Sequence, residues 1–571
     1  MKNATNILYT DLANSVGDVP HSEYPRPLME RNSFACLNGK WDFCVTKDGK
    51  NTDYAEKILV PFPPESALSK ICSVFEDGSF YHYRRTFSIP EGFNVGRVIL
   101  HFGAVDRECE VFVNGVSVGT HRGGYFPFSF DITELLKAEN TVEVKAYDEL
   151  GDYLMPYGKQ KIKRGGMWYT PVSGIWQTVW LESVRERHIT VLDCAVDLSG
   201  ADIRVSTSHG GTAEITVHTD EGDIAVMTDN DGNARVNIPK PRLWSPEQPY
   251  LYRYTVKYGD DEVRSYFGLR TLEIGDVNGK KRMLLNGKPY FYNGLLDQGY
   301  WSDGLFLPAT EAGYAQDVEC AKSLGFNMLR KHIKIEPQRF YYDCDRLGIA
   351  VFQDMINNGR YSFFFDTALP TVLTKHRLNP FAHRNKKKRA EYLRAMEETV
   401  ELLKNHPSIV LWTVFNEGWG QFDADNVAKK LKTLDNTRHI DTASGWYISK
   451  ENEFDSRHVY FKKFKVGKVT KPLYLSEFGG YSYKPEGHVF NTENTYGYRM
   501  FDNADKYAEA VEKLFEDEII PAVREGLCAT VYTQLSDVED ETNGVVTYDR
   551  KVVKLRADRM RAIAEKIKNE L

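Results

Sequence analysis

The pattern of apolar residues changes once along this chain, near residue 273, and one type of secondary structure cannot satisfy both patterns. Before that point, apolar and polar residues alternate in short runs separated by turn signals, as in antiparallel β-sheet. After it, short continuous apolar runs alternate with segments whose apolar residues recur every 3.6 residues, as in parallel α/β structure. The 571 residues are enough for several domains, so the sequence predicts an all-β part followed by an α/β part.

The all-β part divides into two predicted domains. Residues 1–183 contain about eight short strands, which suits a jelly-roll-like sandwich. Their clearest piece is a hairpin at 108–119, where Asn114-Gly115 supplies a two-residue turn with positive φ. Residues 184–272 continue with short strands at the spacing of an immunoglobulin-like sandwich.

Residues 273–571 are predicted to form an α/β TIM (β/α)₈ barrel. The intervening helices carry apolar stripes such as Leu393, Met396, Val400 and Leu403. Eight strands in a segment of this length fit such a barrel. The expected strands are 289–295, 327–331, 350–355, 409–416, 439–444, 456–460, 473–477 and 529–535.

Composition excludes several classes of function. The net charge of -7 gives no general affinity for nucleic acid or for an anionic membrane. The 8 cysteines are scattered, so we expect neither a zinc ribbon nor a disulfide scaffold. No phosphate loop, metal-ligand cluster or long apolar span is found, so no cofactor, metal or membrane partner is expected. The opening residues lack an apolar leader, which favours a cytoplasmic location.

Two glutamates directly follow apolar strands of the predicted barrel. Glu417 comes after the strand at 409–416, Glu477 ends the strand at 473–477, and glycine-rich sequence follows each. The active sites of such barrels lie at the carboxyl ends of the strands, where the fourth and seventh strands face each other. A carboxylate pair across a cleft suits glycoside hydrolysis, although each glutamate alone could be a solvated loop residue. Aromatic residues that could stack on a sugar lie nearby in the sequence: Trp412, Trp419 and Phe478.

Short motifs spread along the chain resemble those of the family 2 glycoside hydrolases, a group that includes β-galactosidases, β-glucuronidases and β-mannosidases. The resemblance covers essentially the whole chain and implies a jelly-roll domain, an Ig-like domain and a catalytic barrel in that order. A homo-oligomer would follow the habit of this family. The matching motifs are LNGKWDF at 37–43, YRRTF at 83–87, the FVNG hairpin, GIWQTVWLE at 174–182, FGLR at 267–270 and LLNGKPYF at 284–291.

The resemblance also implies roles for individual residues. It makes Glu417 the general acid/base and Glu477 the nucleophile of a retaining mechanism through a covalent glycosyl-enzyme. It implies that Asn416 hydrogen-bonds the 2-hydroxyl of the bound sugar, an interaction that strengthens in the transition state. The other expected substrate-binding residues are Tyr460 beside the nucleophile, His458 on the same wall, the basic pair Arg330 and His332, Trp446, and the loop residues Asp297, Gln298 and Asp537.

Two other classes of protein are possible from the residues alone. A non-catalytic carbohydrate-binding protein would keep the two sandwiches but has no need for both acids. A Schiff-base enzyme would need a strand-end lysine in apolar surroundings. Lys331 ends the second strand, but it stands between Arg330 and His332, which favours a solvated or structural cation.

The sequence favours a galacto-configured sugar, as a terminal β-galactoside or β-galacturonide; glucuronide and mannoside are the alternatives. The Asn-x-Lys motif of the glucuronidase branch is absent, because Glu541-Thr542-Asn543 stands in its place. The loop at 367–390 contains no acid, and its charged run at 386–389 could be a solvated helix start. The basic residues from which we predict a cationic rim are Lys375, His376, Arg377, His383, Arg384, Lys386, Lys387, Lys388 and Arg389, with Lys462, Lys463 and Lys465 after the sixth strand.

Overall fold

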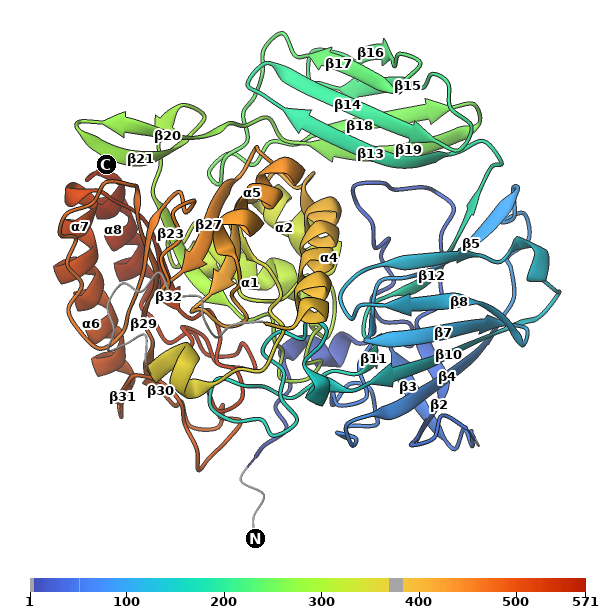
Figure 1. The fold of residues 1–571 in the computed structure, drawn as a ribbon, viewed down its shortest axis with the longest axis horizontal. Helices are drawn as coiled ribbons and strands as arrows, with labels where there is room; N and C mark the ends of the chain where they lie inside the picture. The colour runs from blue at the N-terminus through green and yellow to red at the C-terminus, as the bar shows by residue number, and fades with distance from the viewer. Residues whose placement is uncertain (1–4, 51, 369–383) are drawn as a thin grey trace.

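The protein consists of two β-sandwiches packed beside an α/β barrel (Figure 1). The structure is a computed structural model, and it describes residues 5–50, 52–368 and 384–571. In Figure 1 the first sandwich is blue to teal, the second is green, and the barrel runs from yellow-green to red. No helix among the described residues is both long and apolar enough to cross a membrane.

The first sandwich packs a six-stranded sheet on a four-stranded sheet. Strand β10 alternates buried and half-buried residues, so its apolar face lies on the core. The predicted turn is present between β7 and β8, where Asn114 and Gly115 both have positive φ. The strands are β1 (Ala35–Cys36), β2 (Gly39–Thr46), β3 (Glu56–Val60), β4 (Ser79–Phe87), β5 (Arg97–Phe102), β7 (Glu108–Val113), β8 (Val116–Arg122), β9 (Phe128–Asp131), β10 (Asn140–Asp148) and β12 (Val179–Val184), with the short pair β6 (Val105–Asp106) and β11 (Gly174–Ile175).

The second sandwich is smaller and also antiparallel. Its three-stranded sheet has the order β13-β14-β17 and its four-stranded sheet the order β16-β15-β18-β19. A separate three-stranded sheet, β20-β21-β22, leads into the barrel. The strands are β13 (Ile189–Val196), β14 (Gly200–Thr207), β15 (Glu214–His218), β16 (Ile224–Met227), β17 (Asn233–Asn237), β18 (Tyr252–Tyr258), β19 (Asp261–Phe267), β20 (Leu272–Val277), β21 (Lys280–Leu285) and β22 (Lys288–Pro289).

The barrel is one eight-stranded parallel sheet with the order β27-β26-β25-β24-β23-β32-β29-β28. Its two ends meet through side chains, since Ser456 of β28 donates a hydrogen bond to Asp441 of β27 at 2.8 Å. Both faces are buried in seven of its strands, as expected when helices cover a parallel sheet, whereas β28 is mostly half-buried. The strands are β23 (Tyr292–Asp297), β24 (Met328–Lys331), β25 (Ala350–Asp354), β26 (Ile409–Asn416), β27 (His439–Ser444), β28 (Asp455–Val459), β29 (Leu473–Gly479) and β32 (Leu527–Thr533).

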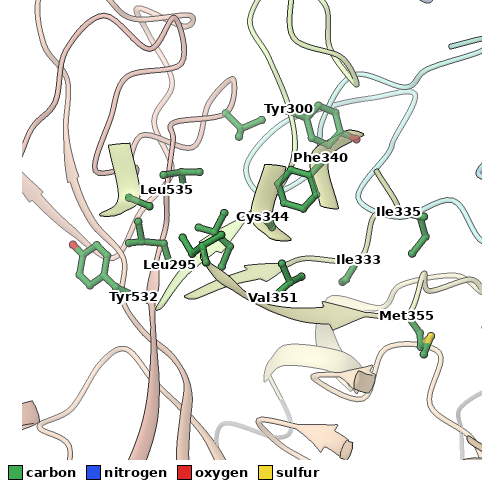
Figure 2. Packing of buried hydrophobic residues seen from close by; sticks show 14 of the residues in the cluster. Leu295, Tyr300, Ile333, Ile335, Phe340, Cys344, Val351, Met355, Tyr532 and Leu535 are labelled. Carbon is green, nitrogen blue, oxygen red and sulfur yellow. The ribbon is translucent and has the colours of Figure 1, made fainter. Parts of the chain in front are cut away.

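Helices pack around the barrel and bury a large apolar cluster beneath them. Figure 2 shows part of this cluster, where Phe340 and Cys344 of helix α2 lie against Leu295 of β23 and Val351 of β25. The helices are α1 (Ala312–Ser323), α2 (Gln338–Leu347), α4 (Lys386–Leu403), α5 (Ala424–Leu434), α6 (Ala504–Leu514), α7 (Ile520–Glu525) and α8 (Ala557–Lys568). Single turns are η1 (Asp11–Ser15), η2 (Thr133–Leu135), η3 (Leu150–Asp152), η4 (Phe363–Ala368) and η5 (Phe515–Ile519), and β30 (Tyr481–Tyr483) pairs with β31 (Arg499–Phe501).

The predicted fold class, two all-β sandwiches followed by a (β/α)₈ barrel, is confirmed. The first barrel strand begins later than the expected 289–295. Lys288 and Pro289 instead pair antiparallel with β21, and the parallel strand starts only at Tyr292.

Candidate active site

The carboxyl ends of the barrel strands carry a network of charged side chains centred on Arg330. This arginine is fully buried, and its Nε and Nη2 donate to the two carboxylate oxygens of Asp354 at 2.9 and 3.1 Å. His332 Nδ1 lies 2.7 Å from the same carboxylate. Arg330 also donates to Glu477 Oε1 at 3.2 Å and to Asn416 Oδ1 at 2.8 Å. We call these five residues the Arg330 network; it joins the ends of four strands.

Glu477 lies where the regular pairing of β29 is interrupted. Its ladder with β28 shifts register between Arg457 and His458, and its ladder with β32 shifts between Leu475 and Phe478. Such irregularities re-aim side chains beside active sites. Here Glu477 Oε2 accepts a hydrogen bond of 2.5 Å from the hydroxyl of Tyr460, which also lies 2.9 Å from Thr533 Oγ1. Both oxygens of Glu477 are therefore held by protein donors.

Glu417 has a different setting, in the turn that follows β26. Its backbone is in the left-handed region, with φ of 51°, which is uncommon for a residue with a side chain and is typical of functional turns. Its side chain is 19% exposed, whereas that of Glu477 is 7% exposed. His458 Nδ1 lies 2.7 Å from Glu417 Oε1 and 3.5 Å from Glu477 Oε2. The imidazole packs against Gly445, where an added Cβ would lie 2.8 Å from the ring.

His458 thus stands between the two glutamates. One ring nitrogen of His458 and one carboxylate oxygen of each glutamate all lie within 4.8 Å of one another. The pair is closer than the roughly 6.5–9.5 Å of inverting glycosidases and matches the short spacing of retaining ones. Histidine and carboxylates are also metal ligands, but tetrahedral ligands about 2.1 Å from an ion are more than ~3 Å apart. The 2.7 Å contact between His458 and Glu417 is a hydrogen-bond distance and leaves no room for an ion between them.

The charges around Glu477 favour its ionised form. Burial alone would raise the pKa of this carboxyl, but the positive charges of His458 and Arg330 and the hydrogen bond from Tyr460 hold the pKa below its ordinary value. Burial lowers the pKa of His332, although Asp354 opposes this effect. Burial raises the pKa of Tyr460 well above its usual range, and the adjacent Glu477 adds to this. The site therefore contains an ionised glutamate beside a tyrosine that stays protonated and donates.

The structure brings together most of the residues expected at the site. The two glutamates, Asn416, Tyr460, His458, Arg330 and His332 form one connected group. Trp446 adjoins it, because its ring lies edge-to-face with His458 at 5.6 Å. Arg330 orients Asn416 through the amide oxygen, so the amide nitrogen is the end left to donate to a ligand.

The expected loop residues are engaged elsewhere. Asp297 accepts from Lys331 Nζ at 2.5 Å and from the backbone of Gly299 at 2.8 Å. Asp537 is buried and accepts from Lys554 Nζ at 2.6 Å and from the backbone of Gly544 at 2.8 Å. Burial raises the pKa of Asp537 to about 6, against the effect of Lys554. Gln298 donates to Gln534 at 2.9 Å.

The expected stacking surfaces need correction, whereas Lys331 is the structural cation that the sequence favoured over a Schiff-base lysine. Trp412 and Phe478 are core residues, because both are buried and pack under the helices. Trp419 is buried too and forms part of an aromatic wall rather than an open platform. Lys331 is a buried structural cation, and Asp297 and Glu336 outweigh burial and raise its pKa, so it is not a neutral nucleophile.

The cationic rim is mainly a solvated surface in the part that the structure describes. Lys462, Lys463 and Lys465 are exposed, as are Lys386 and Lys387. Lys388 instead turns to the first sandwich, where it donates to the backbone of Asp152 at 2.9 Å. The rim residues Lys375, His376, Arg377 and His383 lie outside the described residues.

Sequence reasoning missed two contributors to the site. Asp354 anchors both Arg330 and His332, and its signal was an acid at the end of the third strand, one residue after the apolar run. The second contributor comes from the first sandwich, whose Trp168 and Tyr157 pack edge-on against Trp419 at 5.1 and 5.5 Å. No local motif reveals this contact, because it joins residues more than two hundred positions apart.

A parallel barrel with a close carboxylate pair at its carboxyl end, preceded by two β-sandwiches, has the architecture of the multidomain glycosidases. Family models identify the group within this class. Residues 59–183 match the sugar binding domain of the glycosyl hydrolases family 2, residues 185–270 match the second model of that family, and residues 276–552 match its TIM barrel domain. The chain belongs to glycosyl hydrolase family 2.

Individual relatives are more distant. A β-galactosidase of Thermoanaerobacter pseudethanolicus is 30% identical over 300 residues, which are 48% of this chain and 39% of that protein. The chain spans only 39%, 40% and 38% of the length of the first curated relatives that it matches. Two solved structures share the fold. A β-D-glucuronidase of Dictyoglomus thermophilum has a TM-score of 0.74 and 19% identity, covering 95% of this chain and 98% of that one. A β-galacturonidase of Eisenbergiella tayi bound to galacturonate has a TM-score of 0.69 and 19% identity, covering 96% of this chain and 99% of that one.

Proposed function

We propose that the protein is a retaining exo-β-glycosidase that hydrolyses a terminal β-linked hexopyranoside by double displacement. The observation that carries this proposal is the Glu417–His458–Glu477 group, in which a ring nitrogen of His458 and one carboxylate oxygen of each glutamate lie within 4.8 Å of one another. At this separation the second carboxylate is close enough to attack the sugar itself, rather than to activate a water from a distance. Trp168 and Tyr157 wall the barrel mouth beside Trp419, which favours a terminal sugar over the middle of a chain.

The two glutamates take different roles because their surroundings differ. Glu477 is the nucleophile, since its pKa is held low and Arg330 and Tyr460 fix both of its oxygens. Glu417 is the general acid/base, since it is more exposed and stands in a turn where it can reach the leaving oxygen and then a water. Asn416 presents its amide nitrogen to the 2-hydroxyl of the sugar.

In the first step a Glu477 oxygen attacks the anomeric carbon, the bond to the aglycone oxygen breaks, and that oxygen takes the proton of Glu417. In the second step Glu417, now a carboxylate, takes a proton from water. The water oxygen attacks the same carbon and displaces Glu477. Two inversions at one carbon give net retention of configuration.

For the glycone, we infer a galacto configuration, as galactoside or galacturonide. The similarity to a β-galactosidase at 30% identity supports this inference. The glucuronidase-type Asn-x-Lys, which grips a sugar carboxylate, is replaced here by Glu541-Thr542-Asn543 with a buried carboxylate, which counts against a glucuronide. Glucuronide and mannoside are the alternatives among substrates.

The test is a panel of nitrophenyl β-glycosides (galactoside, galacturonide, glucuronide and mannoside) with the wild type and Glu477→Gln. We expect turnover of at least one galacto-configured substrate, a first product with retained configuration by NMR, and a kcat at least about 10³-fold lower in the variant. Inversion of configuration, or near wild-type turnover by the folded variant, would contradict the mechanism. Sugar binding without turnover of any glycoside would identify a carbohydrate-binding protein instead.

A further inference from the structure

A loop of the first sandwich reaches the barrel mouth and is fixed there. It runs from η3 to β11 and includes Tyr157, whose backbone N–H donates to Asn357 O at 3.1 Å and whose hydroxyl donates to Gly359 O at 2.8 Å. Both acceptors follow β25 in the barrel. The ring of Tyr157 also lies edge-on to Trp419, in the turn that carries Glu417. This loop therefore forms one side of the proposed active site.

Lys159 stands in this loop, and its two neighbours hold its backbone in place. Gly158 has a φ of +67°, and a Cβ there would lie 2.8 Å from the carbonyl oxygen of Ile333, the residue after His332. Gln160 is buried, donates to Tyr157 O at 2.9 Å and accepts from the backbone of Val172 at 2.6 Å. The carbonyl of Lys159 accepts from Tyr169 N at 3.0 Å. The main chain next to Lys159 thus lies close to Ile333, two residues beyond the end of β24.

The ammonium group of Lys159, in contrast, has no hydrogen-bond or ion-pair partner among the described residues. The ammonium lies over the ring of Trp168, with 5.7 Å between Nζ and the ring centroid. Two buried lysines of the barrel domain differ: Lys334 is paired with Glu336 at 2.9 Å and Lys554 with Asp537 at 2.6 Å. Lys159 is half-buried as a residue, and its ammonium makes no direct ion pair among the described residues.

The charge of Lys159 acts on the barrel mouth. It opposes the burial that raises the pKa of Glu541, and it adds to the burial that lowers the pKa of His332. Lys159 and Glu541 attract each other at longer range, but they form no direct ion pair, and the carboxylate accepts from Tyr169 Oη and, at 3.0 Å, from Asn543 Nδ2. Lys159 is therefore a cation beside the barrel mouth that makes no direct ion pair with a carboxylate of the described residues.

We propose that Lys159 binds the carboxylate of a uronic acid glycone, so that the first sandwich supplies the cation that selects an acidic sugar. A neutral sugar would leave this ammonium unpaired, whereas a uronate would form a charge-assisted hydrogen bond with it. This proposal rests on the glycosidase function proposed above and names its substrate class. It makes the β-galacturonide the preferred substrate over the β-galactoside.

The test compares Lys159→Met with Lys161→Met, a matched control. Lys161 lies on the same loop with its Nζ 5.4 Å from the Trp168 ring, but it is exposed. We expect Lys159→Met to lower kcat/KM on the β-galacturonide by about ten- to hundredfold, mainly through KM, and to change kcat/KM on the β-galactoside less than about threefold. Lys161→Met should change neither, and Lys159→Arg, which keeps the charge, should recover most of the uronide activity.

Equal losses on both substrates would overturn the proposal, since Lys159 would then bind a hydroxyl or only support the loop. Unchanged uronide kinetics in Lys159→Met would overturn it as well. Binding of free galacturonate, measured by calorimetry in wild type and Lys159→Met, separates this outcome from failure of the glycosidase proposal. A wild type that cleaves galactosides but neither binds nor cleaves uronides keeps the glycosidase function and refutes the role of Lys159. A wild type that binds galacturonate through Lys159 but cleaves no glycoside keeps the role of Lys159 and refutes the glycosidase function.

Discussion

Arg330 and Lys331 are consecutive residues of β24, both are buried, and both pair with carboxylates, yet they belong to different networks on opposite sides of the barrel wall. The Arg330 network reaches Glu477 in the barrel mouth. The second group, which we call the Lys331 network, consists of Asp297, Lys331, Lys334 and Glu336. Successive side chains of a strand point to opposite faces, so one step along the chain separates the proposed site from a domain junction.

The Lys331 network lies where helix α2 and the first sandwich meet the barrel. Lys331 Nζ is 4.1 Å from the ring centroid of Phe340 in α2. Lys334 Nζ is 4.6 Å from the ring of Phe306 and 5.8 Å from that of Trp176, a residue of the first sandwich. None of these contacts faces Glu417 or Glu477. A buried charge network at a strand end can therefore hold domains together instead of supporting catalysis, and the face of the strand on which it lies determines its role.

The largest expected difference between the networks comes from removing one carboxylate charge in each. Asp354→Asn leaves one acceptor oxygen where two now serve Arg330 and His332, so Arg330 loses its bidentate ion pair and the two basic side chains are held less firmly beside Glu477. We expect kcat/KM to fall by about 10²-fold, because small misplacements of catalytic groups cost this much. Steady-state kinetics on the best substrate of the panel gives this value, with folding checked by circular dichroism.

Asp297→Asn is the matched control. It removes a buried, paired carboxylate of the other network, which should weaken the fold but leave kcat/KM of the folded protein within about threefold. A comparable loss of activity in both variants would mean that the networks are not functionally separate.

The sequence could predict the fold and the centre of the site because both depend on strong local signals. The strands at 409–416 and 439–444 have the predicted bounds, since long apolar runs next to turn residues leave little choice of register. Asn416 ends such a strand and Glu417 follows it, while Glu477 stands two residues before the end of β29.

The direction of a side chain at a strand end was harder to predict. Asp297 was expected to contact sugar, but it pairs across the ladder with Lys331 and shares its outward face, whereas Leu296 pairs with Arg330. Both faces of a parallel barrel strand are buried, so the apolar pattern does not reveal which residues point inward. The same uncertainty hid Asp354, and the loop with Lys159 was hidden because its contacts to the barrel are distant in sequence.

A smaller effect within the Arg330 network is expected from Tyr460→Phe, which removes the hydrogen bond of 2.5 Å to Glu477. That bond stabilises the ionised carboxylate and helps to hold its pKa low. Glu477 must be ionised to attack, so activity is lost as the pH falls through its folded-state pKa, and without the hydroxyl this loss begins at a higher pH.

We expect kcat/KM of Tyr460→Phe to fall about tenfold near neutral pH, and the acidic limb of its pH profile to move upward by up to about one unit. The measurement is kcat/KM from pH 3.5 to 8 in wild type and variant. An acidic limb that stays in place, or moves downward, would show that Tyr460 does not support the charge of Glu477.

The smallest effect on catalysis and a clear effect on stability are expected from Glu336→Gln in the Lys331 network. Glu336 is buried and pairs with Lys331 and Lys334, so its neutralisation leaves two ammonium groups with Asp297 as their remaining carboxylate. Breaking such a pair costs about 3 kcal/mol or more, whereas kcat should stay within about twofold, because no member of the Arg330 network changes.

Burial already lowers the pKa of Lys334 to about 8, against the opposing charge of Glu336, and the substitution lowers it further. A lysine whose folded-state pKa lies below its unfolded value destabilises the fold as the pH falls through the interval between the two, so in the variant this interval extends below pH 8. The loss of stability, measured by urea unfolding, should therefore be larger at pH 6.5 than at pH 9. A loss that is independent of pH, or a large fall in kcat, would contradict the assignment of this network to the domain junction.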